Sequence, residues 1–209
     1  MPPNEEMKRM PTPLPTDPLR QFTRWRDEWL AADAQAPDAQ APGSAVLATA
    51  DHHGRPSARW VDVAYVDHGF VYFTNHASRK AADVAVNPTA ALCFGWLAKG
   101  RQVRAEGPVS RLDEVESDTY FATLPRSLQL LAWSSDQSAE IDDRQVVRER
   151  FDAERARFSG QEVPRPAHWG GYRLTPEEME FWQRRADEIQ DRVRYRRREE
   201  GWQAVRVAP

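Results

Sequence analysis

The chain has 209 residues, 40% of them hydrophobic, and a formal net charge of −3 at pH 7, which predicts one globular core and argues against wholesale attraction to nucleic acid or to an anionic membrane. Its apolar runs are much shorter than the ~20 residues that a membrane span needs, and its amino-terminal segment lacks the apolar core of a signal peptide. Cys93 is the only cysteine, which excludes an intramolecular disulfide and a multi-cysteine metal site and indicates a cytoplasmic, reducing setting.

The amino-terminal part of the chain divides into an arm, a helix and a linker. Residues 1–16 are rich in proline and show no period, which predicts a flexible arm before a single domain over 17–209. Asp17 followed by Pro18 is typical of a helix N-cap and first helical position. Apolar residues then recur at three- to four-residue spacing up to Trp29, which indicates one amphipathic helix. The low-complexity run AQAPDAQAPG predicts a linker after it.

From Ser44 onward, alternating apolar runs and turns predict mostly strands. A helix is expected from the N-cap Ser78 to Asn87, where Pro88 ends it. Two more helical stretches are expected around 113–123 and 139–158, with an irregular piece between them. Antiparallel strands interrupted by a few helices predict an α+β barrel rather than a parallel doubly wound sheet. The expected strands cover residues 45–50, 58–66, 70–75, 90–98, 101–112, 170–174, 177–183, 192–198 and 202–209.

Thr74, Ser78, Arg79 and Lys80 gather where a predicted strand ends and a helix begins. A helix N-terminus with a hydroxyl, a guanidinium and an ammonium nearby is well suited to bind phosphate. The alternative is an ordinary capped helix with a solvated basic first turn. Because basic residues in a first turn oppose the helix dipole, both interpretations stay open.

Gln102 and Trp182 each have a structural interpretation as well as a ligand-binding one. Gln102, in mid-strand, is able to hydrogen-bond a planar heterocycle, but a bond to a neighbouring strand is more common. Trp182 is able to stack on a ring, although filling the core is the more common role of a tryptophan. The five histidines show no zinc-binding spacing, and no G-x-G-x-x-G motif or P-loop is present.

Nine segments taken together resemble the pyridoxine/pyridoxamine 5′-phosphate oxidase family, over about Asp17 to Pro209. They are SARWV, FTNHASRK, NPTAALCFGW, RQVRAEGPV, SDTYFATLPR, QLLAWSSDQS, VPRPAHWGGYRL, EFWQ and the closing DRVRYRR…GWQAVRVAP. The last part, about 165–209, is similar to the family's carboxy-terminal dimerisation region. The resemblance implies an α+β fold, an FMN-binding split β-barrel with flanking helices, and a homodimer with FMN at the subunit interface.

The resemblance also implies FMN contacts along the chain. Arg79 and Lys80 match the pair that meets the FMN phosphate, and Gln102 matches the glutamine near the flavin ring. Arg59 and the strand after it fall where the family binds flavin, but register alone decides which way Trp60, Asp62 and Tyr65 face. The implied cofactor-binding positions are Arg59, Ala64, Phe73, Thr74, Arg79, Lys80, Gln102, Gln137, Ser138, Trp182 and Arg192.

The substrate side departs from the family pattern. The family holds its substrate's phosphate with a lysine, a tyrosine, an arginine and a serine, and of these only Tyr120 is present here. Ala64, Leu124 and Leu128 stand at the lysine, arginine and serine positions, and the family's arginine-x-histidine pair reads Glu188-Ile189-Gln190. The candidate substrate residues are therefore Tyr120, Leu124, Leu128, Glu188 and Gln190, and no catalytic residue is identified.

These changes predict an FMN-dependent oxidoreductase that acts on a small, non-phosphorylated molecule. By analogy with the family's phenazine-biosynthesis branch, this is a heterocyclic intermediate of specialised metabolism. One alternative is a true pyridoxine 5′-phosphate oxidase in which Arg126, Arg184 or Arg185 supplies the missing charge. Another is a non-catalytic flavin or ligand binder. The expected partners are a second copy of the chain and the small molecule, with neither nucleic acid nor membrane.

Overall fold

The computed structural model describes residue 10, residues 14–33 and residues 43–209. Most of the predicted arm and linker lies outside these residues. Within the arm, Met10 is buried in the main core and Leu14 packs against it. Within the described residues, no helix is long and apolar enough to cross a membrane.

Six antiparallel strands close into a barrel, in the order β4–β1–β2–β3–β6–β5, and the pairing of β4 with β5 completes the ring. These strands are β1 (Ser44–Ala50), β2 (Pro56–Val66), β3 (Phe70–Asn75), β4 (Thr89–Trp96), β5 (Arg101–Arg111) and β6 (Trp169–Leu174). One edge of β5 is shared, because residues 109–111 pair with β6 while residues 101–106 pair with β7 (Glu178–Gln183). Beyond β7, the sheet continues through β8 (Asp191–Arg198) and β9 (Gly201–Arg206). The predicted α+β barrel is confirmed.

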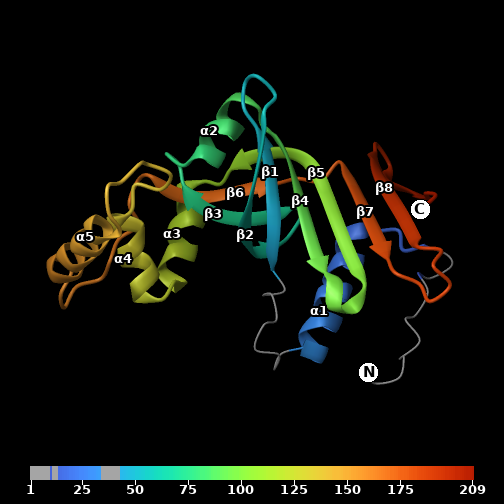
Figure 1. Cartoon of the computed structure of the whole chain (residues 1–209), viewed down its shortest axis with the longest axis horizontal. Coiled ribbons are helices and arrows are strands. Elements are labelled where there is room, and N and C mark those ends of the chain that lie inside the picture. Colours follow the sequence, from blue (N-terminus) through green and yellow to red (C-terminus); the bar gives the residue numbers. More distant parts are fainter. Residues whose placement is uncertain (1–9, 11–13, 34–42) are drawn as a thin grey trace.

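The helices of the described chain lie around this sheet. They are α1 (Pro18–Asp33), α2 (Arg79–Val86), η1 (Leu97–Lys99), α3 (Glu114–Thr123), α4 (Arg126–Ser134) and α5 (Arg144–Arg157). In Figure 1, α3, α4 and α5 form a lobe at one side of the barrel, and β7 and β8 lie at the opposite side. The helical stretch expected around 139–158 begins at Arg144, where the Asp143 side chain accepts a hydrogen bond from the Gln145 amide.

The irregular piece expected between the last two helices contains a further helix, α4, so this expectation was wrong over Arg126–Ser134, and irregular chain follows over 135–143. This helix starts directly after Pro125 and has no side-chain cap, so the usual start signal is missing from the sequence. Its stability comes from packing: Leu130 is buried with Phe121, Phe158 and Val163 in a small hydrophobic cluster.

The main core fills the barrel and the face of α1. Phe22 of α1 packs against Phe70 and Phe94, with ring centroids 4.9 and 4.6 Å away. The cluster under the helical lobe is separate from this core. The molecule therefore has two packed units, a barrel and a lobe, and the candidate site lies where they meet.

Candidate active site

Three polar side chains from three parts of the chain meet beside the start of α2. The Lys80 ammonium donates to Thr74 Oγ1 and to Gln137 Oε1, each at 3.1 Å, and Thr74 Oγ1 donates to Gln137 Oε1 at 2.8 Å. Lys80 is only 8% exposed and forms no ion pair with a carboxylate among the described residues. Burial, and then the charge of the nearby Arg59, lower the pKa of its ammonium.

The first turn of α2 has a spare hydroxyl. Ser78 is the N-cap residue, but its side chain makes no cap bond, and its fully buried Oγ has no hydrogen-bond partner in the described chain. The backbone amide of Arg79 donates to Ser138 Oγ at 3.3 Å. The expected capping bond from Ser78 is therefore absent, and a buried polar atom without a partner is costly unless a ligand supplies one.

Arg59 extends the same cluster from β2. Its guanidinium donates to Thr49 Oγ1 and to Ser57 Oγ, both at 2.6 Å, and lies 3.6 Å from the buried carboxylate of Asp83 on α2. Thr49 Oγ1 in turn donates to Asp83 at 2.6 Å. These contacts anchor α2 to β1 and β2, so that the cationic side chains keep their places.

A cavity of about 400 Å³ opens from this cluster between the barrel and the helical lobe. Its polar end carries Lys80, Thr74 and Gln137, and its walls are mostly apolar. The lining residues are Trp60, Val61, Asp62, Ala64, Phe73, Thr74, Asn75, Lys80, Tyr120, Leu124, Leu128, Leu131, Ala132, Ser135, Gln137 and Trp169. The cavity thus brings together five of the predicted cofactor positions and three of the predicted substrate positions.

An aromatic stack joins the two walls of the cavity. Phe73 of β3 lies face to face with Tyr120 of α3, with centroids 3.9 Å apart and planes 6° apart, and Trp169 lies 5.2 Å away at 13°. The partner of Phe73 in the sheet is Gly171, where a Cβ would lie 2.9 Å from the phenylalanine ring. Burial, and then the charge of Asp62, raise the pKa of the Tyr120 hydroxyl.

Several residues that line the cavity were not among the predicted positions. Trp60 and Asp62 reach the cavity from β2, together with Val61 and the predicted Ala64, so this stretch of β2 faces the cavity. Leu131 comes from the unexpected helix α4, and Trp169 from the start of β6. Of these, only the stretch of β2 was indicated by the sequence, because it follows Arg59.

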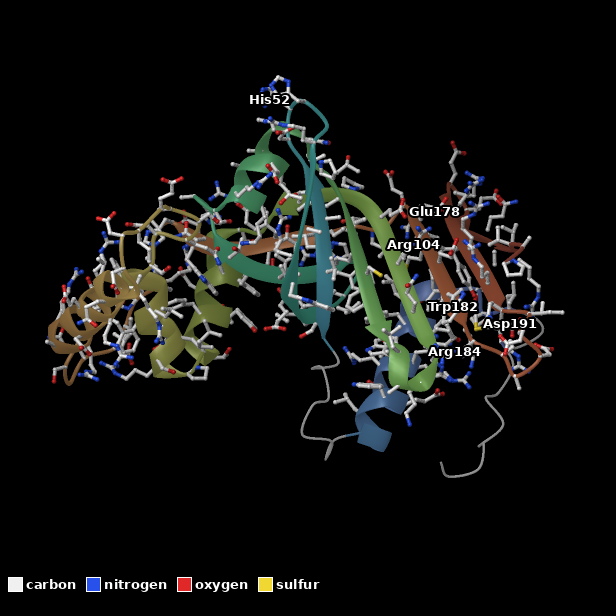
Figure 2. The ribbon with its side chains drawn as sticks, viewed as in Figure 1. His52, Arg104, Glu178, Trp182, Arg184 and Asp191 are labelled. Atoms are coloured by element: carbon white, nitrogen blue, oxygen red, sulfur yellow. The ribbon has the colours of Figure 1, made fainter. Side chains whose placement is uncertain are left out.

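Three predicted cofactor positions stand apart from this cavity. Gln102, Trp182 and Arg192 are direct neighbours in register across β5, β7 and β8. Figure 2 shows Trp182 on this side of the molecule, on the opposite side of the barrel from the helical lobe. The Arg192 guanidinium donates to the buried Glu180 carboxylate at 2.8 Å. The three residues form one row of side chains, which a single copy of the chain does not bring to the cavity.

Two predicted substrate positions are also remote from the cavity. Glu188 and Gln190 lie in the connection between β7 and β8, where Glu188 has a positive φ of 62°. The Gln190 side chain accepts a hydrogen bond from the Arg185 amide and donates one to the Glu188 carbonyl, so both of its bonds lie within the β7–β8 connection.

Among the described residues that line the cavity, none is a replacement cation at the substrate positions. Arg126 donates to the Gln161 and Phe158 carbonyls and closes the end of α5. Arg184 and Arg185 lie just after β7, away from the lining residues. None of the three arginines lines the cavity, so none supplies the charge that the alternative hypothesis needs within one chain.

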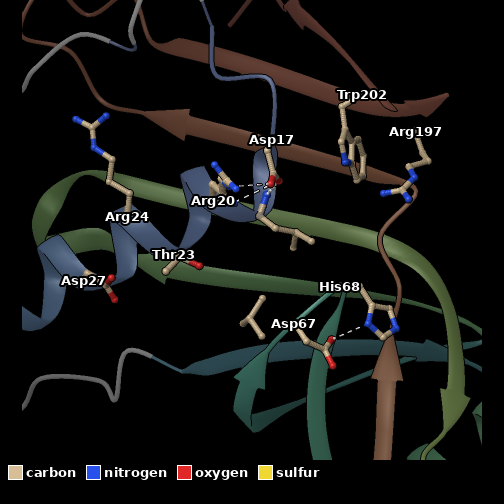
Figure 3. A pocket seen from close by; sticks show the side chains of 11 residues that line it. Asp17, Arg20, Thr23, Arg24, Asp27, Asp67, His68, Arg197 and Trp202 are labelled. Atoms are coloured by element: carbon tan, nitrogen blue, oxygen red, sulfur yellow. Dashed lines mark hydrogen bonds and ion pairs between the residues drawn. The ribbon is translucent and has the colours of Figure 1, made fainter. Parts of the chain in front are cut away.

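A larger cavity of about 820 Å³ lies elsewhere, between α1, the β2–β3 turn and the β8–β9 turn (Figure 3). Its charged groups are largely paired: Arg20 lies 3.5 Å from Asp17, and His68 lies 3.4 Å from Asp67. None of the predicted site residues line it, and for this reason we place the site in the smaller cavity.

Comparison with known proteins identifies the family. The family model described as pyridoxamine 5′-phosphate oxidase matches residues 32–158, and that of the pyridoxine 5′-phosphate oxidase C-terminal dimerisation region matches residues 169–209. The chain belongs to the pyridoxamine 5′-phosphate oxidase family. It is therefore an FMN-binding oxidoreductase, which confirms the predicted cofactor and enzyme class.

Relatives of this family cover nearly the whole chain. The pyridoxine/pyridoxamine 5′-phosphate oxidase of Ralstonia pickettii is 48% identical over 92% of this chain and 89% of its own length. That of Rubrobacter xylanophilus is 47% identical over 92% and 87%. Among solved structures, PhzG from Burkholderia lata 383 in complex with tetrahydrophenazine-1-carboxylic acid has a TM-score of 0.84 and 30% identity, covering 93% of this chain and 94% of PhzG.

The polar end of the cavity fits the phosphate of FMN. A phosphate dianion here would bring negative charge beside the buried Lys80 and acceptors to the start of α2, where the buried Ser78 hydroxyl, which does not itself line the cavity, has no partner in the described chain. Among the described residues Lys80 has hydrogen-bond acceptors but no carboxylate, and a buried cation without a counter-ion is costly, so a bound phosphate would account for it.

Proposed function

We propose that this protein is an FMN-dependent oxidoreductase whose substrate is a small, non-phosphorylated, partly apolar molecule, a heterocyclic intermediate of specialised metabolism. The observation that carries the proposal is the lining of the cavity. Ala64, Leu124 and Leu128 surround it at the positions where the family pattern has a lysine, an arginine and a serine for the substrate phosphate. Apolar groups favour an apolar ligand and give a phosphate ester no compensation for its lost hydration.

In this proposal, the α2 end holds the cofactor. Ser78, Arg79 and Lys80 bind the FMN phosphate, while Thr74 and Gln137 hold the Lys80 ammonium in place. When bound, FMN supplies a two-electron acceptor. The Phe73–Tyr120 stack, Leu124 after α3 and the leucines of α4 orient the substrate and keep water out of the cavity.

A second copy of the chain completes the site in this proposal. Gln102, Trp182 and Arg192 form a row on the far side of the barrel, and Arg192 and Trp182 belong to the segment that matches the dimerisation region. In a two-fold dimer, each copy brings its row toward the cavity of the other. This arrangement explains why Gln102, Trp182 and Arg192 match the family's FMN contacts although they lie away from the cavity within one chain.

A second candidate function is pyridoxine/pyridoxamine 5′-phosphate oxidation. The observation that favours it is the name of the relatives that are 47–48% identical to this chain. In that case, cations from outside the cavity would have to replace the missing ones.

Anaerobic addition of pyridoxine 5′-phosphate to the purified, FMN-loaded protein separates the two candidates. We expect no bleaching of the visible flavin band, while reduced heterocycles without a phosphate bleach it. Rapid bleaching by pyridoxine 5′-phosphate would overturn the proposal and establish the second candidate.

A further inference from the structure

The charges of the cavity are divided between its two ends. Of the described residues that line it, Asp62 and Lys80 are the charged ones. Lys80 is engaged with Thr74 and Gln137 beside α2. Asp62 lies three residues beyond Arg59 on β2, which places it about 10 Å further along the strand, away from the phosphate-binding end. The cavity is therefore cationic at one end and anionic at the other.

Asp62 is exposed at the cavity and has one hydrogen-bond partner among the described residues. Its register partner on β1 is Ser44, whose hydroxyl donates to Asp62 Oδ1 at 2.6 Å. The carboxylate forms no ion pair with any described residue, and its second oxygen makes no hydrogen bond within the described chain. Its charge is felt across the cavity, because it contributes, after burial, to the raised pKa of the Tyr120 hydroxyl.

The residues that line the cavity with Asp62 determine which ligand groups bind beside it. Ala64, which also lies on β2, and the side chains of Leu124 and Leu128 offer methyl groups and no cation. A phosphate or carboxylate near Asp62 meets like charge, whereas an ammonium or N–H group gains a charge-assisted hydrogen bond. An aromatic ring next to that group packs on the apolar wall.

Resting on the proposed function, we propose that Asp62 is a specificity-determining residue that binds an amino or protonated nitrogen group of the substrate. The substrate class is then an apolar ring system that bears a cationic amine, and anionic analogues are excluded. A preference for a cationic group does not follow from the missing substrate-phosphate residues, because their absence alone would admit neutral and cationic molecules equally.

The test uses three probes that share one ring and differ in charge: benzylamine, protonated at pH 7, benzyl alcohol and benzoate. Their dissociation constants are measured anaerobically on the FMN-loaded protein by tryptophan and flavin fluorescence. We expect benzylammonium to bind at least ~10-fold more tightly than benzoate, which corresponds to about 1.4 kcal/mol. In Asp62→Asn this ratio should fall to within ~3-fold, with FMN occupancy unchanged.

Two variants control for indirect effects. Asp62→Glu keeps the negative charge and should retain the preference of the parent for benzylammonium over benzoate. Glu114→Gln removes one negative charge from the exposed first turn of α3, outside the cavity, and should leave the ratio as in the parent. A parent protein that does not prefer benzylammonium to benzoate overturns the proposal, and so does a preference that survives in Asp62→Asn. Bleaching by pyridoxine 5′-phosphate instead overturns the proposed function, so the two failures are distinguishable.

Discussion

Phe73 and Tyr120 stack face to face across the boundary between the barrel and the helical lobe, with centroids 3.9 Å apart. One ring belongs to β3 and the other to α3, so the stack ties together two units that have separate hydrophobic cores. The cavity of the candidate site lies along this boundary. Its shape consequently depends on how firmly the lobe is held against the barrel.

The stack should contribute a measurable coupling energy. We expect a double-mutant cycle of Phe73→Ala and Tyr120→Ala to give about 0.5–1.5 kcal/mol of coupling in the free energy of unfolding, measured in urea. A matched cycle of Tyr120→Ala with Val115→Ala, an exposed position on the same helix, should give a coupling near zero. Additive effects for Phe73 and Tyr120 would show that the stack does not hold the lobe.

Ser78→Ala should separate cofactor binding from fold stability. The Ser78 hydroxyl has no partner in the chain, so its loss should leave the thermal midpoint of the FMN-free protein unchanged or slightly raised. The dissociation constant of FMN should rise by ~10-fold or more, because a hydrogen bond to a charged phosphate is worth about 1.5–3 kcal/mol. Fluorescence titration of the FMN-free protein measures this change.

The control for Ser78 is a residue that does cap its helix. The Asp113 side chain accepts from the Glu116 amide at 2.7 Å, and Asp113→Ala should cost about 1 kcal/mol of stability with FMN affinity retained. Unchanged FMN affinity in Ser78→Ala would contradict the assignment of this hydroxyl to the phosphate.

Restoring the family pattern should restore binding of a phosphate ester. In the triple variant Ala64→Lys, Leu124→Arg and Leu128→Ser, two cations return to the cavity wall. At about 1.5 kcal/mol each, they should tighten binding of pyridoxine 5′-phosphate by about 100-fold, measured by fluorescence quenching under anaerobic conditions. Pyridoxine, which lacks the phosphate, is the matched probe and should gain little. An equal gain for both would mean that the variant changed only the size of the cavity.

Stability should fall in mild acid because of His76, which lies between β3 and α2. Burial, and then the charges of Arg111 and Arg165, lower the pKa of this histidine to about 4, below its ordinary value of about 6.5. Between these pH values the unfolded chain binds a proton that the folded chain does not. The histidine therefore costs no stability above about pH 6.5, and stability is lost progressively as the pH falls toward 4.

Urea denaturation between pH 7 and 4.5 measures this effect. His76→Asn should have a flatter dependence on pH than the parent. The control His52→Asn changes a histidine in the exposed β1–β2 turn, at the tip labelled in Figure 2, and should behave like the parent. Parallel curves for the parent and His76→Asn would show that other groups govern the loss in acid.

The elements with strong local signals were predictable from the sequence. The strands β1 to β9 follow from alternating apolar residues between turns, and α1 follows from its apolar spacing and its cap. Helix α4 was not predictable, because it has no side-chain cap and depends on burial of Leu130 against residues distant in the chain. A signal that comes from tertiary packing leaves little trace in a local pattern.

The sequence by itself determined the chemistry of the site: the order of its motifs indicates FMN, and leucine and alanine at the substrate positions indicate a pocket without phosphate-binding cations. The tertiary structure decided which of these residues meet. It set the register of β2, which turns Asp62 and Ala64 toward the cavity, and it separated Gln102, Trp182 and Arg192 from the α2 cluster. The physical reason is that residue type reports the chemistry of a side chain, whereas strand pairing and helix docking set the direction in which it points.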